Sequence, residues 1–135
     1  MKLRSLFCCA VFCMLSVTVA NAFSSIPEYL KDGYKDQKDY KSFLETVDAL
    51  KSKCDVCHKP GADKKAKGHG LNDFGKVYHD QFDHKGFSTA HKAKDTEKAM
   101  ELFKAAWEKS VTEKNADGKE FLELIKQGQL PGKND

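Results

Sequence analysis

Cys54-Asp55-Val56-Cys57-His58 is the stretch of this sequence that decides the fold and the chemistry. Two cysteines stand three positions apart, and a histidine follows the second one directly. A cysteine pair at this spacing is compatible with covalent haem attachment, with a zinc site, or with a redox-active dithiol. The residues around the pair decide among these three possibilities.

The whole pattern matches haem attachment better than the other two. The thiols of Cys54 and Cys57 can add to the two vinyl groups on one edge of a haem, which puts His58 at the iron as the proximal ligand. A zinc ion would need two more ligands, such as His58 and His69, but His58 is awkwardly placed for the ion that Cys57 would bind. A dithiol would be expected in a βαβ context, and the flanking segments here have helical periodicity. We therefore expect one covalent haem c.

The N-terminal segment has the features of a secretory signal peptide. Lys2 and Arg4 precede an apolar run over residues 6–20, and Ala20-Asn21-Ala22 has the small-x-small pattern of a cleavage site. The run is short for a membrane-spanning helix, although an uncleaved anchor is the alternative interpretation. We expect cleavage of residues 1–22, export to the periplasm or an equivalent compartment, and no stable membrane insertion afterwards.

Cleavage would leave a single domain over residues 23–135. Cys8, Cys9 and Cys13 would be lost, so Cys54 and Cys57 would be the remaining cysteines. Of the 23 basic residues, 21 would remain against 20 acidic ones. A nucleic-acid-binding domain would normally be clearly basic, so this balance argues against nucleic acid as a partner.

The apolar spacing predicts an all-α fold with about four helices wrapped around the haem. Their expected ranges are 36–53, 72–82, 95–110 and 119–127, with Asn72 as the N-cap of the second helix and Asp95 or Thr96 as the N-cap of the third. The segments 23–35, 59–70 and 83–94 are expected to be a polar lead and two loops. Residues 115–118 read as a turn, and Gly128 is expected to end the last helix.

Two further stretches carry a family resemblance. Gly68-His69-Gly70-Leu71-Asn72-Asp73-Phe74-Gly75 is similar to a loop that follows the attachment motif in many class I c-type cytochromes. With residues 117–121 and 128–132, the chain resembles small monohaem cytochromes of planctomycete-type and anaerobic ammonium-oxidising bacteria. The resemblance implies a cytochrome c-like fold, with the 68–75 loop on the proximal side of the haem. Some relatives have a distal cysteine thiolate, for which the mature chain has no spare cysteine.

The sixth iron ligand decides between functions, and several side chains compete for it. Met100 is the only methionine after residue 22, and a thioether ligand is typical of electron carriers. Met100 also belongs to an apolar stripe, where methionine commonly fills a core. His79, His84 and His91 are the alternatives, although each has polar surroundings typical of a surface histidine. His69 is expected on the wrong side of the haem.

Two classes of function follow. The first is a non-enzymatic electron carrier, because neither a nucleophile motif nor an acid–base pair is evident. The second is a haem protein with an open or labile sixth site that binds nitric oxide or carbon monoxide, or a haem subunit of a larger complex. The expected partner is a redox protein, and pairing with a second small cytochrome is a further option. The lysines of the loop that follows the motif either attract an acidic partner or are simply solvated; they are Lys59, Lys64, Lys65 and Lys67.

Overall fold

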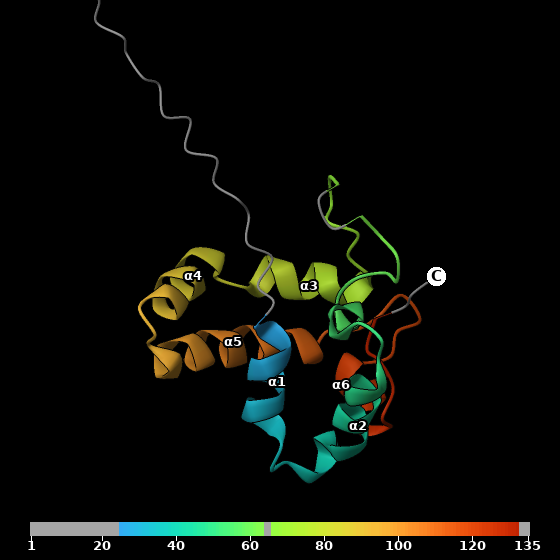
Figure 1. Ribbon diagram of the computed structural model, residues 1–135. Coiled ribbons are helices and arrows are strands. Elements are labelled where there is room, and N and C mark those ends of the chain that lie inside the picture. The colour runs from blue at the N-terminus through green and yellow to red at the C-terminus, as the bar shows by residue number, and fades with distance from the viewer. Residues whose placement is uncertain (1–24, 64–65, 133–135) are drawn as a thin grey trace, which may run out of the picture.

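The computed structural model describes residues 25–63 and 66–132, and within these ranges the chain is helical. Two short 3₁₀ helices, η1 and η2, accompany the α-helices (Figure 1). No strand occurs in the described ranges, which confirms the all-α class. The elements are α1 (Ile26–Tyr34), η1 (Lys38–Tyr40), α2 (Lys41–Ala49), η2 (Lys53–Val56), α3 (Asp73–Gln81), α4 (His84–Lys92), α5 (Thr96–Val111) and α6 (Phe121–Lys126).

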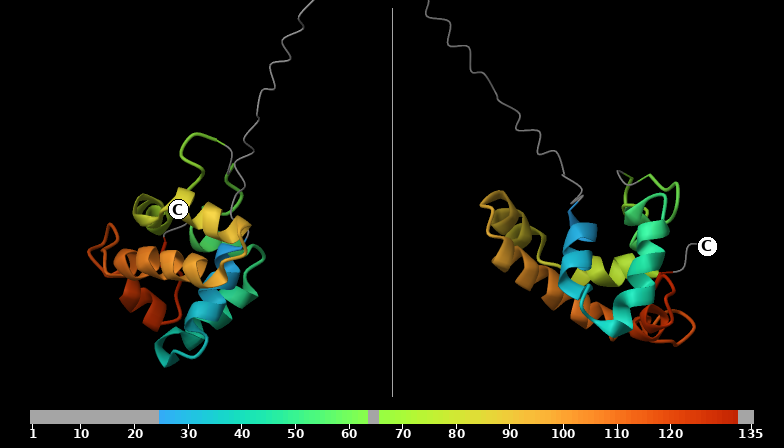
Figure 2. Two further views of the ribbon diagram at one scale, coloured as in Figure 1. Left: turned by 90° about the vertical axis from the view of Figure 1, so that its left-hand side faces the viewer. Right: turned by 60° about the horizontal axis from the view of Figure 1, so that its bottom comes forward.

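The long helix α5 is the centre of the fold. It contacts α1, α3, α4 and α6, and the views in Figure 2 show these shorter helices arranged around it. Phe103 and Trp107 on α5 are fully buried, and the Trp107 Nε1 donates a hydrogen bond to the Tyr40 hydroxyl at 3.2 Å. Most of the core is aromatic; its other buried rings are Tyr34, Tyr40, Phe43, Phe74, Tyr78, Phe82, Phe87 and Phe121.

The predicted ends of three helices are confirmed by local hydrogen bonds. The Asn72 side chain caps α3 by accepting from the Gly75 N–H at 2.8 Å, and Asp95 caps α5 by accepting from the Lys98 N–H at 3.0 Å. Gly128 follows α6 with φ at +72°, a conformation that glycine adopts without a steric penalty. The expected turn before α6 is also present, with Gly118 at φ +79°.

Two segments predicted as a lead and a loop are wrong, because both contain helices. In α1 only Leu30 and Tyr34 are buried, so the apolar signal in the sequence is confined to one turn. In α4 the signal is similarly short, with Phe87 and Ala90 as the buried residues. Packing against α5 stabilises both helices, and it is tertiary packing rather than periodicity that decides short amphipathic helices.

The predicted continuous helix over 36–53 is also corrected. The chain forms η1, then α2, and leaves the helix at Leu50, whose ψ is 138°. Ser52 is extended as well, and η2 begins after it. Apolar residues at helical spacing within this range do face the core, since Tyr40, Phe43 and Val47 are buried. The break turns the chain so that Val56, inside the cysteine motif, reaches the core.

The predicted signal peptide lies outside the described residues. Within the described ranges, no helix is both long enough and apolar enough to cross a membrane.

Candidate functional site

The cysteine motif is held by η2 and by the loop that leads into α3. Cys54 lies in η2, and Cys57 is the residue that ends it. The Cys54 carbonyl accepts hydrogen bonds from the backbone N–H groups of Cys57 at 3.1 Å and His58 at 2.9 Å. This tight turn brings both thiols and the imidazole to one short segment. Both cysteines are partly buried, and neither forms a disulfide within the described part of the chain.

The imidazole of His58 is fixed by a backbone carbonyl. Its Nδ1 lies 2.7 Å from the carbonyl oxygen of His69, and because that oxygen can only accept, Nδ1 must carry the proton. In the neutral form of this tautomer, the lone pair is on Nε2. A histidine that donates from one ring nitrogen to a carbonyl is in the tautomer and orientation of a metal ligand.

Asn72 fastens the motif to the following helix. Its side-chain Nδ2 donates to the Val56 carbonyl at 3.1 Å, and its backbone N–H donates to the Cys57 carbonyl at 2.9 Å. The same side chain caps α3 through its oxygen, and the residue is fully buried. Gly75 lies against the motif on the next turn, where an added Cβ would be 1.9 Å from the Cys57 carbonyl oxygen. The motif and α3 are therefore one packed unit.

The Cys57 thiol lacks the depressed pKa of a catalytic cysteine. Burial, and secondarily the neighbouring Cys54, raise the pKa of the Cys57 thiol to about 12. Catalytic dithiols need a depressed thiol pKa, because the thiolate is the nucleophile. Within residues 25–63 and 66–132, no three histidine, cysteine or acidic side chains are grouped as ligands for a metal ion.

A covalent haem fits the chemistry of these residues. The thiols of Cys54 and Cys57 would hold it, and His58 would supply a ring nitrogen to its iron. Sulfur atoms for the two thioether bonds and a ring nitrogen for the iron are the donor set that haem c requires.

The sixth-ligand candidates occupy separate places. Met100 is partly buried on α5, and its Sδ lies against α1, 3.3 Å from where a Cβ on Gly33 would be. His91 on α4 is exposed, with its Nδ1 3.3 Å from the Tyr29 hydroxyl. Figure 1 shows α4 at the opposite end of the molecule from η2. None of these positions decides the sixth ligand.

The remaining histidines gather near the motif loop. The rings of His79 and His84 lie 4.4 Å apart between centroids, and the His69 ring lies 5.9 Å from that of His79. All three side chains are exposed, at the end of α3, the start of α4 and the 59–70 loop. The carbonyl of His69 holds the His58 ring, so His69 lies next to the cysteine motif.

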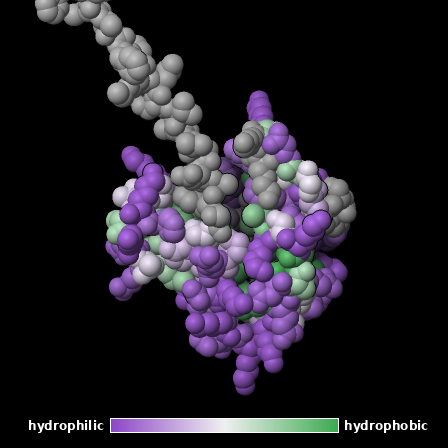
Figure 3. Space-filling view, viewed as in Figure 1, coloured by the Kyte–Doolittle hydropathy of each residue, from purple (hydrophilic) through white to green (hydrophobic). Residues whose placement is uncertain are grey.

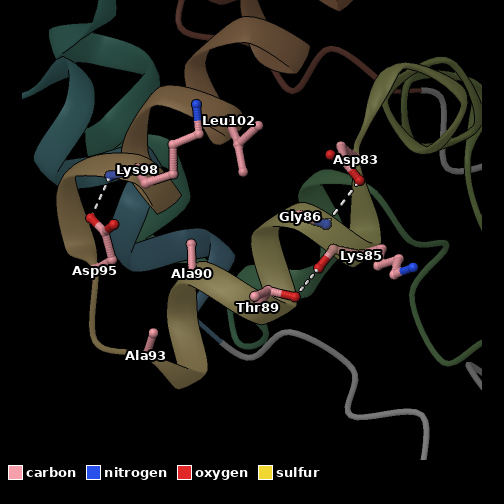
Figure 4. Close-up of a pocket in the computed structure, with 9 residues that line it drawn as sticks. All are labelled: Asp83, Lys85, Gly86, Thr89, Ala90, Ala93, Asp95, Lys98 and Leu102. Atoms are coloured by element: carbon pink, nitrogen blue, oxygen red, sulfur yellow. Dashed lines mark hydrogen bonds between the residues drawn. The ribbon is translucent and has the colours of Figure 1, made fainter.

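The surface around these elements is strongly hydrophilic (Figure 3). Lys59 and Lys67 of the motif loop are exposed, while Lys64 and Lys65 lie outside the described residues. An open groove between α4 and α5 is lined by Asp83 and Asp95 (Figure 4). Both carboxylates accept backbone hydrogen bonds as helix caps, which explains why two acidic residues line this groove.

Sequence reasoning missed two parts of this site. The direction of the His69 carbonyl depends on a left-handed backbone at that residue, with φ at +55°. The side-chain pattern of the sequence does not predict this conformation. The bonds from Asn72 to the motif were also missed, although its position in the 68–75 stretch was a usable signal.

Comparison with known proteins gives no relative on which to base an assignment. No known protein family, no curated protein and no solved structure matches this chain.

Proposed function

We propose that this chain is an exported, monohaem c-type cytochrome with a cytochrome c-like fold that carries single electrons between redox partners. Cys54 and Cys57 would hold haem c through thioether bonds, and His58 would be the proximal ligand. The observation that carries the proposal is the hydrogen bond from Nδ1 of His58 to the His69 carbonyl, 2.7 Å long and directly beside two cysteines outside any described disulfide.

In such a function, the protein mainly holds the haem and its ligand in fixed positions. Bound haem c supplies a one-electron couple between ferric and ferrous iron. The hydrogen bond from His58 to the His69 carbonyl would hold the imidazole in one orientation, with Nδ1 as the protonated nitrogen. The bonds from Asn72 keep the motif rigid, and rigid surroundings keep the reorganisation small when an electron arrives. Exposed lysines such as Lys59 and Lys67 favour a partner with acidic groups at its docking face.

A second candidate function has one observation in its favour. The thioether sulfur of Met100 packs between α1 and α5, in contact distance of the Gly33 position, as a core-filling methionine would. If Met100 stays there in the haem-loaded protein, the sixth position would be open or held by His79, His84 or His91. An open position would suit the binding of nitric oxide or carbon monoxide, alone or within a larger complex.

Carbon monoxide separates the two candidates. For the electron carrier, we expect a sharp low-spin ferrous spectrum that carbon monoxide leaves unchanged, because the sixth position is filled. Replacement of Met100 by leucine should then remove the sulfur-to-iron absorption band of the ferric protein and lower the reduction potential. A wild-type ferrous spectrum that shifts readily with carbon monoxide would instead support the gas-binding function.

A further inference from the structure

His79 and His84 bring two imidazole rings together at the surface. Their ring centroids lie 4.4 Å apart, with an angle of 48° between the ring planes. Both residues are exposed, and the His79 side chain keeps 43% of its surface accessible to solvent. The thioether bonds and the proximal ligand of the proposed haem site use neither ring. The pair therefore needs an explanation of its own.

The turn that joins α3 to α4 holds the two rings in place (Figure 1). His79 lies in the last turn of α3, and Phe82, which follows the helix, is buried and anchors the turn. The Phe82 N–H donates to the His79 carbonyl at 3.4 Å, and the Phe82 carbonyl accepts from the His84 N–H at 3.0 Å. Asp83 then caps α4 by accepting from the Gly86 N–H at 2.9 Å. The backbone thus presents both imidazoles together without rearrangement.

The spacing of the two rings suits two ligands of one metal ion. With a metal–nitrogen bond of about 2.1 Å, two imidazoles at neighbouring coordination positions have ring centres on the order of 4.5 Å apart. The rings of His79 and His84 have this separation. The His69 ring lies further out, 5.9 Å from that of His79, and within the described ranges no three side chains are grouped as metal ligands. Water would complete the coordination of an ion held by the pair.

The chemical state of the pair also favours a cation. Burial, and secondarily the neighbouring His79, lower the pKa of His84 below its usual 6.5, so this ring is neutral at pH 7, the form that binds metals. The His79 backbone acts on the His84 ring through a hydrogen bond, which orients the ring. The Asp80 carboxylate lies 3.8 Å from Nδ1 of His79 and adds negative charge beside it. Backbone carbonyls and carboxylates are the usual outer-shell partners of metal-binding histidines.

We propose that His79 and His84 form a surface site for a divalent transition-metal ion, separate from the haem and completed by water. Imidazole nitrogen suits zinc, copper and nickel, whereas magnesium and calcium prefer oxygen ligands. Two protein ligands make an open site, so the ion would exchange with solution. The inference goes beyond the proposed function and does not rest on it, because neither ring takes part in the proposed haem attachment.

The test is a calorimetric titration of the purified exported protein with zinc chloride, with magnesium chloride as the control ion. His79→Ala and His84→Ala should each weaken zinc binding by at least the roughly tenfold to hundredfold that loss of an outer-shell partner costs a metal site. Both residues are exposed, so the helical circular dichroism spectrum should stay unchanged. His91→Ala removes another exposed histidine, about two turns further along α4, and should leave the zinc affinity unchanged.

The outcomes separate this inference from the proposed function. Zinc held by Cys54 and Cys57 in protein without haem would persist in all three histidine variants, so their comparison isolates the pair. An unchanged zinc affinity in both His79→Ala and His84→Ala, or an equal loss in His91→Ala, would overturn the inference. So would an altered visible spectrum of the haem-loaded protein in either pair variant, because that ring would then be a haem ligand. Absence of covalent haem would contradict the proposed function alone.

Discussion

Nδ1 of His58 donates a hydrogen bond to the backbone carbonyl of His69, 2.7 Å away and eleven residues further along the chain. The bond closes the loop between the cysteine motif and α3. An antiparallel bridge between His58 and Leu71 and a hydrogen bond from the Lys59 N–H to the Gly70 carbonyl at 2.8 Å reinforce the closure. The imidazole of His58 is thus oriented by main-chain atoms.

The side chain of His69 should therefore be dispensable. His69→Gly keeps the carbonyl and suits the backbone conformation there, with φ at +55°. We expect this variant to keep the visible spectrum and the reduction potential of the wild-type haem protein. His69→Val is the matched opposite, because a β-branched residue is strained at this φ and should destabilise the loop. Loss of the wild-type spectrum in His69→Gly would show that the imidazole itself acts at the iron.

Replacing Asn72 should cost far more stability than replacing an ordinary helix cap. Asn72→Ala removes the α3 cap and leaves the buried Val56 carbonyl without its donor. We expect a loss of about 2–3 kcal/mol in the free energy of unfolding, measured by urea denaturation. Asp95→Ala removes an exposed cap from α5 and should cost about 1 kcal/mol. Equal losses in the two variants would contradict the role of Asn72 as a clamp on the motif.

Gly75 marks the closest approach between α3 and the motif. In Gly75→Ala the new methyl group would meet the Cys57 carbonyl oxygen at 1.9 Å, so backbone must move. We expect a destabilisation of about 3 kcal/mol, at the upper end of overpacking costs. Gly33→Ala in α1 is the control, because its methyl group would meet only the flexible ends of Lys104 and Met100, at 3.1 and 3.3 Å. Gly33→Ala should be neutral or stabilising by up to about 1 kcal/mol. Thermal unfolding measures both variants, and a Gly75→Ala protein as stable as Gly33→Ala would contradict the close packing of α3 on the motif.

The sequence predicted the parts of the fold that depend on long, regular signals. The stripe of α5 and the caps at Asn72 and Asp95 are of this kind, because cap and periodicity reinforce each other. The helices α1 and α4 were missed because each buries only two residues of its own. Both helices are stabilised by packing on α5, a contact that the short apolar pattern within each helix does not reveal.

The candidate site also combines features that are local in the sequence with contacts between distant residues. Cys54, Cys57 and His58 lie within five residues of one another, so the hypothesis of haem attachment can be formed from their spacing alone. The carbonyl that orients His58 and the bonds from Asn72 to the motif depend on contacts between separate segments. Such contacts between distant residues are invisible to motif and periodicity arguments.

The ion pairs of Asp48 give the chain a defined response to acid. Asp48 on α2 pairs with Lys31 of α1 at 2.7 Å and with Lys53 of η2 at 3.6 Å. The hydrogen bond from Lys31, and the charges of both lysines, lower the pKa of the Asp48 carboxyl below its usual 3.8. The folded state therefore binds this proton less tightly than the unfolded state does, so the stabilisation is complete above pH 3.8 and is lost as the pH falls below it.

Asp48→Asn should reduce this acid dependence. We expect the variant to lose slightly less stability than the wild type between pH 5 and pH 2, with the effect weakened by salt because the groups are exposed. Glu45→Gln removes the same charge from an exposed position of the same helix and is the control. Identical acid-unfolding curves for the Asp48 variant and the wild type would contradict the contribution of the two ion pairs.

The most direct test of the central claim is the intact mass of the exported protein, produced in cells that attach haem and measured under denaturing conditions with visible absorbance. We predict one haem retained on the polypeptide through Cys54 and Cys57, so that the mass equals that of residues 23–135 plus one haem. Replacing both cysteines by alanine should abolish the retained haem, and replacing one should leave a single thioether bond. A wild-type protein that shows the mass of the bare polypeptide, with no absorbance that survives denaturation, would contradict the assignment of this chain as a c-type cytochrome.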